Sequence, residues 1–332
     1  MPTPTPIVDR RLNQHDRRIW ELVARSPLQS LWTRDGLTFG KIAKCIWQSI
    51  MEDRIFGHSA ELGFYFLFSL FPTLLCASAI LGLVARSAAT IYDRLLSYLA
   101  FVVPTSAFHA VLSTFNQTAA SASSGKITFG LIAAVWSASV GVSAVQETLD
   151  VVYKINDRRS YIKARIQAIG LTIILIGTIS LCLSSLFLGD FAARWAHQDL
   201  RGPFLAETVA IASRICGWIL ATAFLALTFS LTYYWAPDLR ARRWRWLTPG
   251  AAIGMAAWLI ASLGLRIYLH FFNTYTVTYG SLGAVIILLM WFYITGLMLL
   301  VGAEINSEIE ASAVEARITP LLPSRDTVAP AA

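Results

Sequence analysis

This sequence contains few charged residues. Only 14% of its 332 residues are Asp, Glu, Lys or Arg, whereas soluble domains carry about a quarter. Hydrophobic residues make up 56% of the chain, and the mean hydropathy is +0.57. A composition this apolar excludes an ordinary soluble enzyme and indicates a membrane protein.

Cysteine and histidine are also scarce, and neither forms a recognisable site. The five histidines are scattered, and the sequence contains no H-E-x-x-H motif and no P-loop. We therefore expect no metal, no cofactor and no enzymatic activity. The N-terminus lacks the apolar core of a signal peptide. Four cysteines show neither paired nor metal-ligand spacing, so we interpret them as apolar side chains: Cys45, Cys76, Cys182 and Cys216.

Long charge-free windows define the fold class. A helix needs about 20 apolar residues to cross the roughly 30 Å hydrocarbon core of a bilayer. Six windows meet this requirement: Leu62–Ala85, Ile127–Gln146, Ile166–Gly189, Ile215–Pro237, Trp246–Leu265 and a stretch within Phe271–Ala303. We predict an all-α, polytopic membrane bundle of six transmembrane helices, with additional amphipathic helices at the membrane interface.

Lysine and arginine are distributed unequally between alternate connections. Twenty of the 27 fall in the N-terminal segment, the second and fourth connections and the C-terminal tail, whereas five fall in the other connections. The positive-inside rule then places both termini in the cytoplasm, with an even number of spans. We attribute the net charge of +7 to attraction between these clusters and anionic lipids rather than nucleic acid.

The chain divides into three parts by composition. Residues 1–36 are predicted to be a mobile cytoplasmic segment, residues 37–310 the membrane domain, and residues 311–332 a disordered cytoplasmic tail. Within the membrane domain, apolar residues recur at helical spacing over 39–56 and again over 88–116. The first amphipathic helix either lies on the inner membrane surface or packs on the bundle, and the second region would cover the outer mouth of the bundle.

Charged residues at the ends of the predicted spans are candidates for function, because each is costly to hold near lipid. Snorkelling and pairing with neighbours such as Arg54, Lys154 and Arg158 would explain them. Alternatively, the arginines attract an anionic head group, and the acids take part in gating or ion coupling. Glu304 and Glu308 share a helix face flanked by Asn306, where they either share a proton or cation or form a solvated helix end. The candidates are Glu61, Arg214, Arg266, Glu304, Asn306 and Glu308.

Several short motifs occur in order between about residues 40 and 310. They are SLFP (Ser69–Pro72), WSAS (Trp136–Ser139), PGA (Pro249–Ala251), YGSLGAV (Tyr279–Val285), LLMWFY (Leu288–Tyr293) and GAEIN (Gly302–Asn306). In these motifs the sequence resembles the YihY/BrkB family of bacterial inner-membrane proteins, which is UPF0761-like and was historically mislabelled ribonuclease BN. The resemblance implies a six-span protein with both termini inside, and a role in moving envelope lipids or other amphiphiles. The sequence itself offers no metal site for ribonuclease chemistry.

Pro72 interrupts the first predicted span, where proline removes a backbone donor and bends the helix. We hypothesise that this bend forms one wall of a lateral cleft, and that a turn enters the sixth span. Bundle stability alone would also explain these residues. They are Phe68, Ser69 and Pro72 for the cleft, and Tyr279, Gly280 and Ser281 for the turn.

Two classes of function remain open. A transporter or flippase-like conduit for an anionic lipid or other amphiphile would have a polar cavity open sideways to lipid. A non-transporting scaffold for envelope partners would have a filled core and an exposed apolar patch outside the lipid belt.

Overall fold

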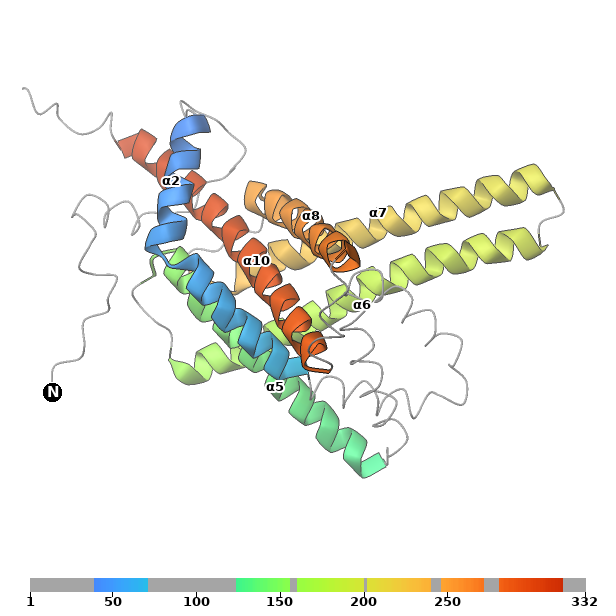
Figure 1. Cartoon of the computed structure of the whole chain (residues 1–332), viewed down its shortest axis with the longest axis horizontal. Helices are drawn as coiled ribbons and strands as arrows, with labels where there is room; N and C mark the ends of the chain where they lie inside the picture. The colour runs from blue at the N-terminus through green and yellow to red at the C-terminus, as the bar shows by residue number, and fades with distance from the viewer. Residues whose placement is uncertain are drawn as a thin grey trace, which may run out of the picture.

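The computed structural model describes residues 39–70, 124–155, 160–199, 202–239, 246–271 and 281–318. Within these residues every regular element is a helix, which confirms the all-α prediction (Figure 1). One helix covers residues 55–70. The others are α2 (Phe39–Glu52), α5 (Ser124–Val152), α6 (Tyr161–Asp199), α7 (Pro203–Trp235), α8 (Pro249–Phe271) and α10 (Ser281–Ile318).

Four of the described helices are long and apolar enough to cross a membrane. The qualifying stretches are Tyr161–Gln198, Phe204–Trp235, Pro249–Phe271 and Leu282–Val314, which coincide with the last four predicted windows. The window Ile127–Gln146 lies on α5, which is not among the four, and Glu147 and Asp150 follow directly on the same helix. The window Leu62–Ala85 lies only partly within the described residues. Six spans therefore stay a prediction.

The membrane helices continue past their apolar windows. α6 has 39 residues and α10 has 38, which at 1.5 Å per residue corresponds to about 58 and 57 Å. Both exceed the roughly 30 Å hydrocarbon core. The additional turns carry charged residues, including Asp190 and Arg194 in α6 and Glu304 and Glu308 in α10.

α6 and α7 run side by side as a long antiparallel hairpin that extends beyond the other helices (Figure 1). Small residues bring their backbones together. A Cβ atom on Gly189 would lie 2.8 Å from the carbonyl oxygen of Ser213, and one on Gly217 would lie 2.8 Å from that of Ser185. Small residues four apart typically allow membrane helices to approach this closely.

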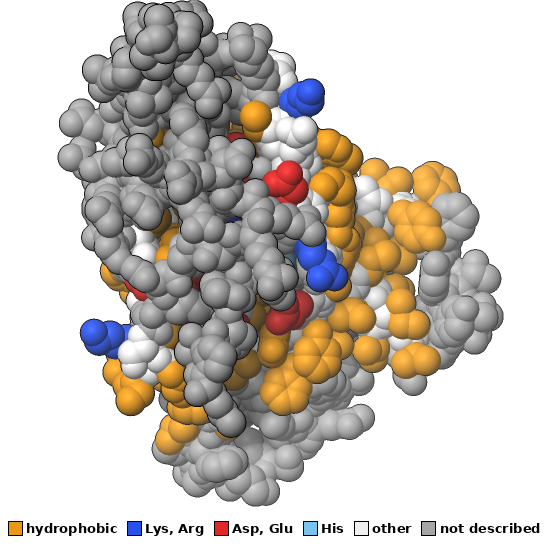
Figure 2. Space-filling view, turned by 90° about the vertical axis from the view of Figure 1, so that its left-hand side faces the viewer, with side chains coloured by type: hydrophobic (Ala, Val, Ile, Leu, Met, Phe, Trp, Pro, Cys, Tyr) orange, Lys and Arg blue, Asp and Glu red, His pale blue; other side chains and the backbone are white. Residues whose placement is uncertain are grey.

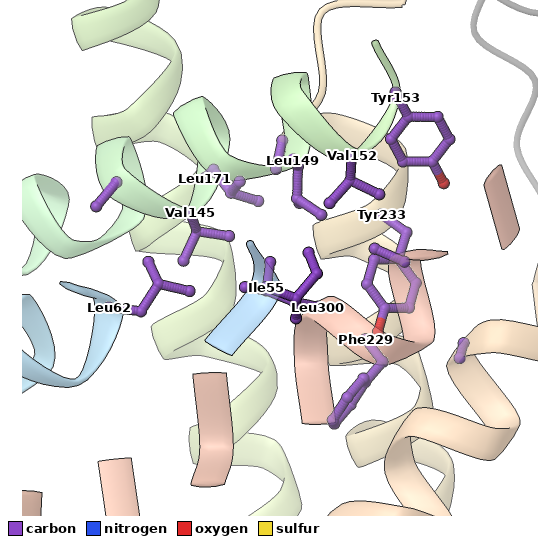
Figure 3. Close-up of a cluster of buried hydrophobic side chains, with 14 of the residues drawn as sticks. Ile55, Leu62, Val145, Leu149, Val152, Tyr153, Leu171, Phe229, Tyr233 and Leu300 are labelled. Carbon is purple, nitrogen blue, oxygen red and sulfur yellow. The ribbon is translucent and has the colours of Figure 1, made fainter. Parts of the chain in front are cut away.

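The buried core lies where the helix of residues 55–70, α5, α6, α7 and α10 meet (Figure 3). Ile55, Leu62, Leu149, Leu171 and Leu300 are at most 1% exposed. Elsewhere the described surface carries many hydrophobic side chains and few charged ones (Figure 2). Such a surface is suited to lipid rather than to water.

The helix expected over residues 39–56 is interrupted. α2 ends at Glu52, and Arg54 adopts a left-handed conformation with φ of 53°. α2 packs against the C-terminal part of α10 (Figure 1). Ile50 of α2 is buried and Trp47 is exposed. The chain therefore changes direction between α2 and the helix of residues 55–70. The amphipathic helices expected over 88–116 lie outside the described residues.

Candidate functional site: a buried charge cluster

Four charged side chains gather where α2, α5 and α10 meet, and we call them the charge cluster. They are Asp53, which follows α2, Lys154, which follows α5, and Glu304 and Glu308 of α10. Glu304 is fully buried, and Asp53 and Glu308 are only 9% and 8% exposed. Charged side chains are rarely buried to this extent unless they are paired. The charge cluster is therefore the strongest candidate for a functional site in the described residues.

Lys154 and Asp53 form a buried ion pair, in which Lys154 Nζ donates to Asp53 Oδ1. The backbone at the end of α5 directs this lysine. Lys154 adopts φ of 52°, its N–H donates to the Val151 carbonyl (2.9 Å), and the Ile155 N–H donates to the Asp150 carbonyl (2.8 Å). This Schellman motif usually has glycine at the position of Lys154. The left-handed conformation costs a lysine about 1–2 kcal/mol, so the ion pair must help to offset that strain.

The two glutamates of α10 have different partners. Ser49 Oγ donates to Glu308 Oε1 (2.6 Å), which ties α2 to α10. Ser307 Oγ lies 3.3 Å from Glu304 Oε2. Glu304 Oε1 and Asp53 Oδ2 are both buried, and no donor among the described residues reaches either atom. Glu304 thus holds an unmatched carboxylate oxygen in the protein interior, which is costly unless a proton or cation is present.

Asp53 and Glu304 lie close enough for their charges to interact. Two carboxylates at close range repel each other. The charge of Lys154 acts on both Glu304 and Glu308, but one lysine cannot neutralise three carboxylates. Among the described residues, the charge cluster therefore holds more acidic than basic side chains. Among the described residues no group of three or more His, Cys, Asp and Glu side chains could hold a metal ion.

Asn306 has a structural position beside the cluster. Its Oδ1 accepts the N–H of Gly250 (2.8 Å), and its Nδ2 donates to Thr248 Oγ1 (2.9 Å), so it completes the N-terminus of α8. A Cβ atom on Gly250 would lie 1.9 Å from the carbonyl oxygen of Gly302. The PGA and GAEIN motifs are thus in contact, which explains why both need a glycine.

The other charged candidates lie in different places. Arg214 lies within α7 rather than at a helix end, with its Nε 3.7 Å from Asp190 Oδ1 of α6. Arg266 is exposed on α8. Glu61 is exposed on the helix of residues 55–70, where its Oε2 lies 3.4 Å from Nδ1 of His58. Of the charged candidates, the structure brings Glu304 and Glu308 into the cluster.

The hypothetical cleft is described only in part. Phe68 is 58% exposed, and Ser69 Oγ donates to the Phe66 carbonyl (2.9 Å). Phe66 also packs near Gly141 of α5, so SLFP begins where the two helices touch. The cleft and the turn stay hypotheses, because four members lie outside the described side chains: Pro72, Tyr279, Gly280 and Ser281, the last of which begins α10.

Sequence reasoning missed Ser49 and Asp53, and it treated Lys154 only as a neighbour that pairs with boundary acids. Asp53 lies in a segment expected to be one continuous amphipathic helix, where a single acid carries no signal. The useful signal was the pair Glu304 and Glu308, because acids at this spacing need a partner when they are buried.

The fold and the site together indicate the class of protein. An all-helical chain with membrane-length apolar helices, a lipid-suited surface and a buried charge cluster is a multi-pass membrane protein. The family model of Virulence factor BrkB matches residues 46–325, and the chain belongs to this family. The resemblance found in the motifs is confirmed.

Individual relatives agree with this assignment. A protein of Bacillus subtilis (strain 168) that is named as ribonuclease-like, YfkH, is 34% identical over 249 residues, covering 75% of this chain and 88% of the relative. The UPF0761 membrane protein Smlt0865 of Stenotrophomonas maltophilia (strain K279a) is 25% identical over 281 residues, covering 83% of this chain. This chain spans only 62% of the length of that relative. No solved structure matches the chain. The name of the UPF0761 relative describes it as a membrane protein, in agreement with the apolar helices of this chain.

Proposed function

We propose that this protein moves an anionic lipid or another anionic amphiphile across the membrane, and that the charge cluster couples this movement to a proton. One observation carries the proposal: Glu304, on a membrane-length helix, is fully buried with an unmatched Oε1 beside Asp53. Ionisable groups buried in membrane bundles are costly and typically mark proton relays or ion pathways.

The charge cluster connects elements that a transport cycle would have to move. Lys154 links the end of α5 to Asp53, and Ser49 links α2 to Glu308. Adding or removing one proton changes the balance between Lys154 and three acids, and hence the strength with which these helices hold together. A protonation-dependent contact between helices is the kind of two-state element that alternating access requires.

The same proposal includes an orientation. The excess of Lys and Arg in alternate connections supports placing both termini in the cytoplasm, and the resemblance to the YihY/BrkB family supports placing the protein in the bacterial inner membrane. The contact between α2 and the C-terminal part of α10 supports placing both ends of the chain on one side (Figure 1). The charge cluster would then lie at the cytoplasmic end of the bundle.

The experiment is a lipid-movement assay in proteoliposomes that contain fluorescently labelled phosphatidylglycerol in one leaflet. We expect wild type to move the label faster than empty vesicles do, at a rate that depends on an imposed pH gradient. Glu304→Gln should remove the gradient dependence. Glu61→Gln is the matched control, because Glu61 is an exposed carboxylate outside the cluster; this variant should behave like wild type.

Two results would count against the proposal. If wild type moves the label no faster than empty vesicles, the protein does not transport this lipid, and the alternative of a non-transporting scaffold for envelope partners is favoured. If Glu304→Gln elutes as wild type in size-exclusion chromatography and keeps the full gradient dependence, the charge cluster is not the coupling site.

A further inference from the structure

Arg165, near the start of α6, is a cation that the proposed function has not used. Its Nη1 donates to Ser143 Oγ (3.3 Å), and its Nη2 donates to the carbonyl of Trp136 (3.3 Å). The guanidinium carbon lies 4.2 Å from the centre of the Trp136 ring. Its Nε is buried, and no acceptor among the described residues reaches it. These partners are all uncharged.

This arrangement differs from that of other cations in the structure. Arg194 and Arg214 both pair with Asp190, and Lys154 pairs with Asp53. Within the described part of the chain, no Asp or Glu forms an ion pair with Arg165. An arginine on a membrane-length helix is costly without a counter-charge. The surroundings of Arg165 are thus suited to an anion that comes from outside the chain.

A second polar side chain nearby is also unmatched. Gln146 follows Ser143 by three residues on α5, so the two share a helix face. Gln146 is only 3% exposed, yet neither its Oε1 nor its Nε2 has a hydrogen-bond partner among the described residues. Buried amides are nearly always paired. An unmatched amide one turn from the serine that holds Arg165 therefore indicates a place for a polar ligand.

We infer that Arg165 and Gln146 bind the phosphate of an anionic head group at the seam between α5 and α6, with Ser143 holding Arg165 in place. A guanidinium matches the geometry of phosphate oxygens and forms strong, charge-assisted hydrogen bonds with them. The Gln146 amide can supply a further donor. Ser143 Oγ instead donates to the Ser139 carbonyl (2.9 Å) and accepts from Arg165, so it positions the guanidinium. Trp136, which is 56% exposed, offers an aromatic surface for the part of the amphiphile next to the phosphate.

The inference rests on the proposed function for its meaning, since it assigns a docking site to the transported amphiphile. Ser143 precedes Lys154 by 11 positions on α5 and its terminal turn, or about 16 Å at 1.5 Å per residue. The site and the charge cluster thus share one rigid element. Arg214 is less suited to this role, because its Nε faces Asp190.

Native mass spectrometry of the full chain, incubated in detergent with either phosphatidylglycerol or phosphatidylcholine, tests the inference. We expect wild type to retain phosphatidylglycerol preferentially, and Arg165→Gln to lower that retention by about tenfold, as loss of a charge-assisted contact would. Gln146→Leu should lower it less. Arg194→Gln is the matched control on the same helix and should retain the lipid as wild type does.

The outcomes separate phosphate recognition from general positive charge. Arg165→Lys keeps the charge but not the planar fork, so we expect intermediate retention. Equal retention of phosphatidylglycerol by wild type and Arg165→Gln, with equal thermal unfolding midpoints, would overturn the inference.

A parallel experiment with inorganic phosphate shows whether the site binds free phosphate or the phosphate of a lipid. If phosphate alone raises the unfolding midpoint of delipidated wild type but not of Arg165→Gln, and displaces phosphatidylglycerol, the site holds free phosphate. If phosphate has no such effect while the lipid is retained, the site recognises a lipid head group. Because retention is measured without transport, a failed lipid-movement assay leaves this result intact.

Discussion

Replacing Gly250 with alanine tests the packing that positions α10, and with it the charge cluster. A Cβ atom at this position would lie 1.9 Å from the carbonyl oxygen of Gly302 and 2.6 Å from the side chain of Asn306. Favourable contacts between heavy atoms occur at about 3.5–4.0 Å. Neither neighbour can simply swing aside, because one is backbone and the other is hydrogen-bonded to Thr248 (2.9 Å). The substitution must therefore push α8 away from α10 by more than about 1 Å.

The expected cost has two parts. Overpacking of a close helix contact typically costs about 1–3 kcal/mol. Displacement of the Gly250 N–H from Asn306 Oδ1, now 2.8 Å apart, removes a buried hydrogen bond that contributes about 1 kcal/mol. Together they predict a loss of about 2–4 kcal/mol in the free energy of unfolding for Gly250→Ala.

Thermal unfolding of the purified protein in detergent, followed by tryptophan fluorescence, measures this effect. Gly264→Ala is the control on the same helix, since no atom of a neighbouring element in the described part of the chain lies within 4 Å of a Cβ atom there. Alanine is favoured over glycine in a helix interior by about 1 kcal/mol, so the control should unfold at or above the temperature of wild type. If Gly250→Ala unfolds together with Gly264→Ala, the close approach of α8 and α10 is wrong.

Two further predictions follow from the hairpin and the charge cluster. Gly189→Ala should lower the unfolding temperature, because a Cβ atom would lie 2.8 Å from a backbone oxygen of α7. Gly177→Ala on the same helix should not, because the described residues leave open space around that position. Equal unfolding midpoints for the two variants would refute the close contact between α6 and α7. Lys154→Met should destabilise the protein by about 3–5 kcal/mol, since it leaves Asp53 buried without its cation. Adding Asp53→Asn should restore part of that loss in the same unfolding assay, and no recovery would mean that the ion pair is not what Lys154 contributes.

The membrane helices could be predicted from the sequence because crossing a bilayer requires a local property, a long apolar run. The window Ile166–Gly189 located α6 for this reason, but not its end at Asp199. Beyond the apolar run, α6 is held helical by its contact with α7, and no local pattern records that contact. In the same way, the turn at Asp53 and Arg54 interrupts a continuous amphipathic pattern, because the chain must change direction to bring Ser49 to Glu308.

The sequence by itself determined the membrane class, the helical fold, the family and the fact that Glu304 and Glu308 share a face, since helical spacing is fixed by backbone geometry. Only the tertiary structure decided which groups meet those acids. Lys154 and Asp53 are 101 residues apart, and Ser49 and Glu308 are 259 apart. Whether such groups form a buried cluster or separate solvated charges depends on how the helices pack. The reason is that charged groups interact strongly in the protein interior and only weakly in water.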